Sequence, residues 1–105
     1  MLERTRESLQ VAVTTNLNST AEIILGRYAT CLLHVPDGSS INSLTVHGYD
    51  PINDHYSPLY KADGTAVVLT VDEDGCYEVP IAVYASERIR LVGDAAGDIV
   101  VTLVT

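Results

Sequence analysis

The chain has 105 residues, of which 47% are hydrophobic and 19% are charged. This length suits a single domain with one core, and the composition excludes a disordered chain. Six Lys and Arg residues stand against 14 Asp and Glu residues, which gives a net charge of −8. Nucleic acids and anionic membrane surfaces are recognised through clustered positive charge. We therefore expect neither a nucleic acid nor a membrane as a partner.

The first eight residues differ from the rest of the chain. Residues 1–8 are polar and mixed in charge, and they show no signal-peptide pattern. Arg4 and Arg6 place two of the six positive charges in this short segment. We expect residues 1–8 to form an N-terminal arm. It is either a frayed terminus or a segment that orders on a neighbouring subunit or on a capsid shell, where its arginines pair with carboxylates. We expect residues 9–105 to form a single domain.

Alternation of apolar with polar or small residues predicts β-strands along most of the chain. Leu9, Val11 and Val13, for example, occupy every second position. Turn residues separate such runs, as in 62–65, where Asp-Gly suits a tight hairpin. The expected strands cover residues 8–15, 20–25, 28–35, 42–48, 55–60, 65–71, 81–84, 87–93 and 98–104.

About eight short strands with frequent turns and little helical periodicity predict an all-β fold. We expect an antiparallel β-sandwich of the jelly-roll or immunoglobulin-like type. Its two sheets would enclose the apolar side of each strand. The side chains expected in this core are Val11, Val13, Ile24, Leu32, Leu44, Val46, Val68, Leu69, Ile89, Leu91, Val101 and Leu103.

Two cysteines, Cys31 and Cys76, are too few for a disulfide framework. Each lies in an apolar, strand-like stretch, so we expect two buried thiols, and a single disulfide between them stays open. A metal site is not expected. The acidic run 72–74 before Gly75 resembles part of a calcium loop, but Thr70 stands where that loop needs an acid. The pattern therefore favours a solvated turn.

No pattern of residues indicates catalysis. His34, His47 and His55 lack the spacing of metal ligands on one helix face, and no local signature pairs them with a nucleophile. The sequence has neither a Gly-x-Ser-x-Gly elbow nor a phosphate-binding glycine loop before a helix. We expect a protein that is not an enzyme and that holds no cofactor.

Tyrosine is the only aromatic residue type, with six copies and neither Phe nor Trp. Three of the six, Tyr49, Tyr56 and Tyr60, cluster in one stretch together with Asp54. A tyrosine offers an apolar ring and a polar hydroxyl, which suits protein interfaces and also sugar stacking. Including the arginines of the arm, the candidate contact residues are Arg4, Arg6, Tyr49, Asp54, Tyr56 and Tyr60.

The order of four segments resembles that of small phage virion proteins built as β-sandwiches. Residues 28–36 form a strand that ends in proline, 41–50 hold a Leu-Thr strand, 57–65 hold Pro-Leu-Tyr before Asp-Gly, and 88–103 hold a closing strand pair. The resemblance covers residues 20–105. It implies a protein that decorates or cements a capsid, or one that belongs to a fibre or tail.

From this resemblance we expect a non-enzymatic virion structural protein, a capsid cement or decoration protein that binds the capsid surface and neighbouring copies. Its partners would be the major capsid protein or another virion protein, together with its own copies in a homo-oligomer such as a trimer. It would assemble in the host cytoplasm and reside in the virion. The alternative is a tail, fibre or carbohydrate-binding module that contacts a host-surface glycan through residues 49–60.

Overall fold

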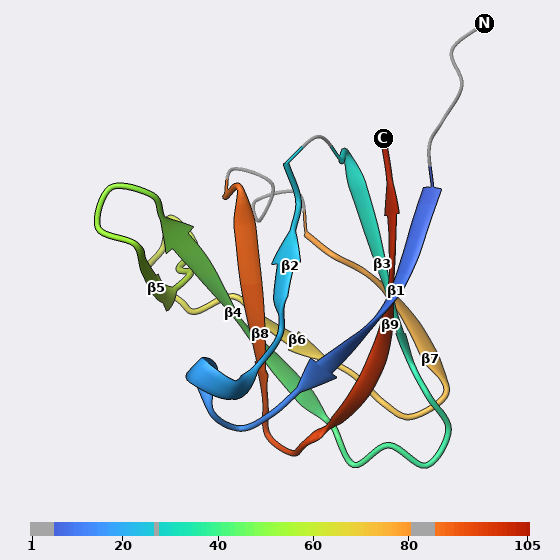
Figure 1. Ribbon diagram of the computed structural model, residues 1–105. Coiled ribbons are helices and arrows are strands. Elements are labelled where there is room, and N and C mark those ends of the chain that lie inside the picture. Colours follow the sequence, from blue (N-terminus) through green and yellow to red (C-terminus); the bar gives the residue numbers. More distant parts are fainter. Residues whose placement is uncertain (1–5, 27, 81–85) are drawn as a thin grey trace, which may run out of the picture.

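The computed structural model describes residues 6–26, 28–80 and 86–105. Within these residues the chain forms nine strands in two antiparallel sheets that pack face to face (Figure 1). The all-β antiparallel sandwich expected from the sequence is confirmed. No helix in the described part of the chain is long and apolar enough to cross a membrane. The elements are β1 (Arg6–Val13), η1 (Leu17–Ser19), β2 (Glu22–Ile24), β3 (Thr30–Val35), β4 (Ser43–Asp50), β5 (His55–Pro58), β6 (Val68–Thr70), β7 (Gly75–Glu78), β8 (Arg88–Gly93) and β9 (Gly97–Val104).

The strand order defines the type of sandwich. One sheet has the order β1-β9-β3-β7, and the other has β2-β8-β4-β5, with β6 also paired to β4. Because β5 and β6 each share residues of β4 with β8, both must lie on the side of β4 that faces away from β8. They act as one interrupted strand, and every other connection crosses from one sheet to the other. This connectivity is that of a jelly-roll, one of the two types that the sequence left open.

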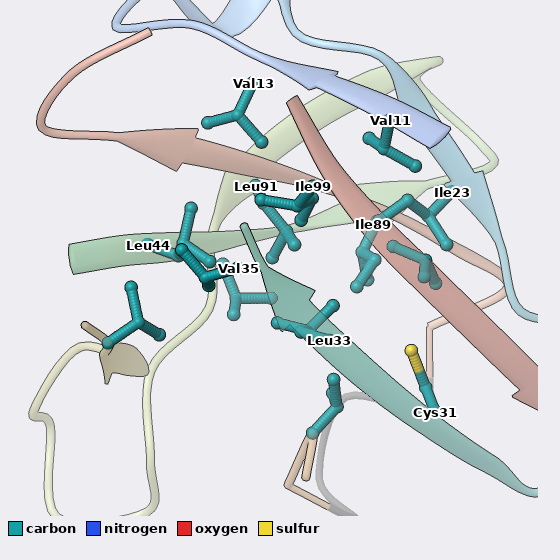
Figure 2. Close-up of a cluster of buried hydrophobic side chains, with 14 of the residues drawn as sticks. Val11, Val13, Ile23, Cys31, Leu33, Val35, Leu44, Ile89, Leu91 and Ile99 are labelled. Carbon is teal, nitrogen blue, oxygen red and sulfur yellow. The ribbon is translucent and has the colours of Figure 1, made fainter. Parts of the chain in front are cut away.

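The apolar core lies between the two sheets and takes every second residue of most strands (Figure 2). Eight of the side chains expected there are buried, and a ninth, Leu69, packs against them while partly exposed. Alternation therefore located the core wherever only one of the two strand faces is apolar. The eight are Val11, Val13, Leu44, Val46, Ile89, Leu91, Val101 and Leu103.

Three expected core residues are wrong by one position. Ile24, Leu32 and Val68 point outward and are 58%, 39% and 46% exposed. In each case the adjacent residues in the chain are also apolar, and it is one of these, such as Leu33, that fills the core. A run of apolar residues satisfies both phases of a period of two, so the sequence could not choose between them.

Most strand boundaries depart from the expected ones by one to three residues, and two differences change the picture of the fold. β1 begins at Arg6, which lies opposite Val104 of β9, so residues 6–8 of the expected arm belong to the sheet. β7 was not expected, because Gly75–Glu78 is short and follows an acidic turn. Asp74 adopts a left-handed backbone with φ of 56° just before it, which acidic side chains tolerate. The strand expected over 81–84 lies outside the described residues.

The two cysteines face opposite sides of one sheet. Cys31 is buried in the core, as expected, whereas the expectation for Cys76 is wrong, because this thiol is exposed on the outer face. There it lies opposite His34, whose Nε2 atom is 3.9 Å from the Cys76 Sγ atom. Both thiols are free. Their side chains point to different faces of the sheet, which is why no disulfide joins them.

Candidate binding site on the outer face of the β2–β8–β4–β5 sheet

The β4–β5 hairpin brings two of the expected tyrosines together. Tyr49 lies opposite Tyr56 across the hairpin, and their rings are 5.1 Å apart with an interplanar angle of 51°. Asp50 holds the loop closed, since its carboxylate accepts hydrogen bonds from the Ile52 amide at 2.9 Å and from the Asn53 side chain at 2.7 Å. These bonds hold the pKa of Asp50 below its usual value. The loop geometry thus fixes both rings on the outer face of the sheet.

Asp54 joins the same cluster from the end of the loop. Its backbone is left-handed, with φ of 50°, and its Oδ1 atom accepts a hydrogen bond from the Tyr49 hydroxyl at 2.6 Å. The hydrogen bond to Asp54, followed by burial, raises the pKa of Tyr49. Tyr49 therefore stays neutral and oriented throughout the physiological range.

Two arginines of β8 cover the tyrosine rings. The Cζ atom of Arg88 lies 4.4 Å from the centre of the Tyr49 ring, and that of Arg90 lies 4.6 Å from the centre of the Tyr56 ring. Residues two apart in a strand point to the same face, so Arg88 and Arg90 stand side by side above the sheet. A guanidinium over an aromatic face is attracted by the ring quadrupole. The result is a layer of two tyrosines and two arginines.

Glu22 of β2 ties this layer to the edge of the sheet. It accepts a hydrogen bond from the Tyr56 hydroxyl and forms an ion pair with Arg88, whose Nη1 atom is 3.4 Å from Glu22 Oε1. Burial, followed by the bond to Glu22, raises the pKa of Tyr56. Arg90 donates to the Leu17 carbonyl at 3.1 Å. We call Glu22, Tyr49, Asp54, Tyr56, Arg88 and Arg90 the Tyr–Arg face.

The Tyr–Arg face carries hydrogen-bonding capacity that the chain does not use. Arg88 Nε, Arg90 Nε and His47 Nδ1 are buried and have no hydrogen-bond partner in the described structure, although buried polar atoms are nearly always paired. A hollow of about 300 Å³ lies beside Arg90, and Glu22, Asp54, Asn18 and His55 also line it. Hydrogen-bond donors and acceptors surround this hollow, and they include both positively and negatively charged side chains. Such a lining suits the binding of a polar group.

The described residues show no arrangement for metal chemistry, since no group of three or more His, Cys, Asp or Glu side chains among them could hold an ion. The acidic run 72–74 instead serves the turn before β7. There Glu73 accepts a hydrogen bond from the Gly38 amide at 2.8 Å. The Tyr–Arg face is therefore the one cluster described here that combines stacked rings, charges and unused donors.

The structure unites half of the expected contact residues. Tyr49, Asp54 and Tyr56 meet in the Tyr–Arg face, whereas Tyr60 is 59% exposed beyond the end of β5 and forms an isolated bridge with Ala66. Arg6 lies in β1 of the other sheet.

Arg4 lies outside the described residues. Sequence reasoning missed Glu22, Arg88 and Arg90 as site residues. The alternation of Arg88 and Arg90 with core residues was a signal for their outward direction, but nothing in the sequence aligned β8 with β4.

Comparison with known proteins finds a solved structure that has the same fold. The sequence matches no protein-family model and no curated protein. The chain is a jelly-roll β-sandwich, and this fold is shared with a solved structure, the SPBc2 prophage-derived protein YomS. The two align with a TM-score of 0.63 over 100% of this chain and 97% of YomS, at 12% sequence identity. At such an identity the likeness concerns the fold.

Proposed function

We propose that this chain is a non-enzymatic structural protein of a phage virion, most specifically a capsid cement or decoration protein. The observation that carries the proposal is the likeness to a prophage-derived protein over 100% of this chain and 97% of the other. Jelly-roll sandwiches are also a common architecture of viral capsid domains. The partners are the major capsid protein or another virion protein, and neighbouring copies of the chain itself.

The Tyr–Arg face supports binding to a protein surface. Tyrosine and arginine are enriched at interface centres. Here each ring is fixed by a neighbouring ring, a guanidinium and a hydroxyl bond. A surface that is already ordered loses little side-chain entropy on binding. The net charge of −8 favours a partner with basic groups at the contact.

The proposed location is the virion, with assembly in the host cytoplasm. Two free thiols agree with assembly in a reducing compartment. The net acidity gives the chain no electrostatic footprint for nucleic acid or for an anionic membrane.

The test is to purify virions of the phage that encodes the chain and to count its copies per particle by mass spectrometry. A fixed, multiple copy number is the expected result, and its absence from washed particles would refute the proposal. Tyr56→Ala should lower the occupancy of the particle, because it removes the support of both Arg90 and Tyr49. Tyr60→Ala is the matched control, since this exposed tyrosine lies outside the Tyr–Arg face.

A second candidate function is the recognition of a host-surface glycan by a tail or fibre module. The observation that favours it is the polar hollow beside Asn18, Asp54 and His55, whose groups can bond sugar hydroxyls. One face of each tyrosine ring is occupied by an arginine, so stacking of a sugar on that face is blocked. Binding to a glycan array that is lost in Asp54→Ala would favour this function over the first.

A further inference from the structure

Among the described residues, β1 is the last strand on one side of the β1–β9–β3–β7 sheet and so forms an open edge. In an antiparallel ladder, alternate residues turn their backbone N–H and C=O groups to opposite sides. The carbonyl of Ala12 accepts a hydrogen bond from the Ala21 amide at 3.0 Å, so Ala12 turns away from β9. By alternation, Arg6, Ser8 and Gln10 also turn their backbone groups away from β9. These three residues form the open edge.

The open edge has few of the features that keep natural sheet edges from pairing. Such edges are blunted by charged side chains, above all lysine, and by proline, bulges or shortness, and of these β1 has only the charges of Arg6 and Glu7. β1 is eight residues long, pairs with β9 without interruption, and contains neither lysine nor proline. Its side chains on the outer face are Arg6, Ser8, Gln10 and Ala12, all of them compatible with a neighbouring strand.

We propose that β1 pairs antiparallel with β1 of a second copy of this chain, with Ser8 opposite the partner's Ser8. In this register Arg6 lies opposite the partner's Gln10, so the backbone groups of the two open edges face each other. The pair forms about six hydrogen bonds. The contact has two-fold symmetry and uses the same surface of both subunits. The two four-stranded sheets then become one continuous sheet.

Charge complementarity selects a second copy as the occupant. Gln10 donates a hydrogen bond to Asp98 at 2.8 Å, so a carboxylate lies next to the position that faces Arg6 of the neighbour. Within each chain, Arg6 forms no ion pair with a described carboxylate. Pairing therefore gives Arg6 an acidic partner, the partner's Asp98, and symmetry forms this contact twice.

The inner row of the same edge adds apolar contact. Leu9 is partly buried and Ile24 is 58% exposed, and together with Glu7 and Glu22 they line a hollow of about 320 Å³ beside the edge. In the proposed register Leu9 lies directly opposite the aliphatic part of the partner's Glu7 and diagonally across from the partner's Leu9, within reach of side-chain contact. The charge of −8 on each copy opposes association, but at about 0.15 M salt it is screened beyond about 8 Å.

This inference deepens the self-association included in the proposed function, and its test uses the isolated full chain. Sedimentation at about 0.15 M salt should give a mass of twice 11.3 kDa at high concentration. Ser8→Pro removes an N–H of the open edge and keeps the ladder to β9, as proline does on edge strands. It should weaken dimerisation at least tenfold. Ser8→Ala keeps that N–H and should leave the dimer intact.

A charge exchange tests the register independently and does not depend on how well Ser8→Pro folds. Arg6→Glu and Asp98→Arg should each weaken the dimer, and the double variant should restore it. Amide exchange followed by NMR should show concentration-dependent protection of Ser8 and Gln10. A monomer at all concentrations, a trimer, or a dimer insensitive to both Ser8→Pro and the charge exchange would overturn the inference. Copy number in virions is a separate measurement, so either proposal can fail alone.

Discussion

Two adjacent leucines can test which residues of β3 face the core. Leu33 is fully buried, and Leu32 is 39% exposed on the other face of the same strand. Leu33→Ala removes an enclosed side chain and leaves a cavity, which costs about 3 kcal/mol or more of unfolding free energy. A chain of 105 residues has an unfolding entropy of about 0.2 kcal/mol/K. The expected loss in melting temperature is therefore about 14 °C.

Leu32→Ala is the matched control for this experiment. Solvent already reaches the Leu32 side chain, so truncation leaves no closed cavity, and the cost should stay below about 1 kcal/mol, or about 5 °C. Both variants are compared with the parent by thermal and urea denaturation followed by circular dichroism. A larger loss at Leu32 would mean that β3 is shifted by one residue, and either this result or equal losses would refute the assignment of the core.

Three further predictions concern single side chains. Burial raises the pKa of Cys31 to about 12, so a thiol reagent should modify only exposed Cys76 in the native protein; reaction of both thiols without denaturant would contradict this. Two backbone N–H groups hold the pKa of Asp94 below its usual value, so its contribution to stability is present above about pH 4 and lost as the pH falls further. Asp94→Asn should therefore lower the melting temperature at pH 7, and the melting temperature of this variant should fall less steeply than that of the parent below about pH 4. An equally steep fall in both proteins would refute this assignment. Arg88→Ala removes the contacts with Tyr49 and Glu22 and should lower the melting temperature by a few degrees, with a change in near-ultraviolet circular dichroism from the tyrosines as the diagnostic signal.

The Tyr–Arg face and the open edge of β1 lie on different sheets. The two contacts that we propose, one with a second copy and one with a different protein, therefore use different sheets. In the proposed virion protein, this separation lets a dimer present two Tyr–Arg faces to a shell. In such a dimer the two contacts would be linked, and two linked contacts bind more tightly than either alone.

The sequence determined the fold class wherever its pattern was unambiguous. In β1 and β8, apolar residues alternate with polar or smaller ones, so the period of two identified both the strands and the buried face, as at Ile89 and Leu91. The Asp-Gly pair at 63–64 marked a real turn, in which Asp63 accepts from the Thr65 amide at 2.9 Å. Local chemistry decides such features, because each depends on residues close in the chain.

The tertiary structure decided what depends on residues far apart in the chain. Leu32 and Leu33 are equally apolar, and only packing against the opposite sheet placed Leu33 in the core and Leu32 outside. Tyr49 and Tyr56 could be grouped from the sequence, but Arg88 joins them only because β8 pairs with β4. Strand pairing of this kind follows from the best burial of the whole chain rather than from any local signal.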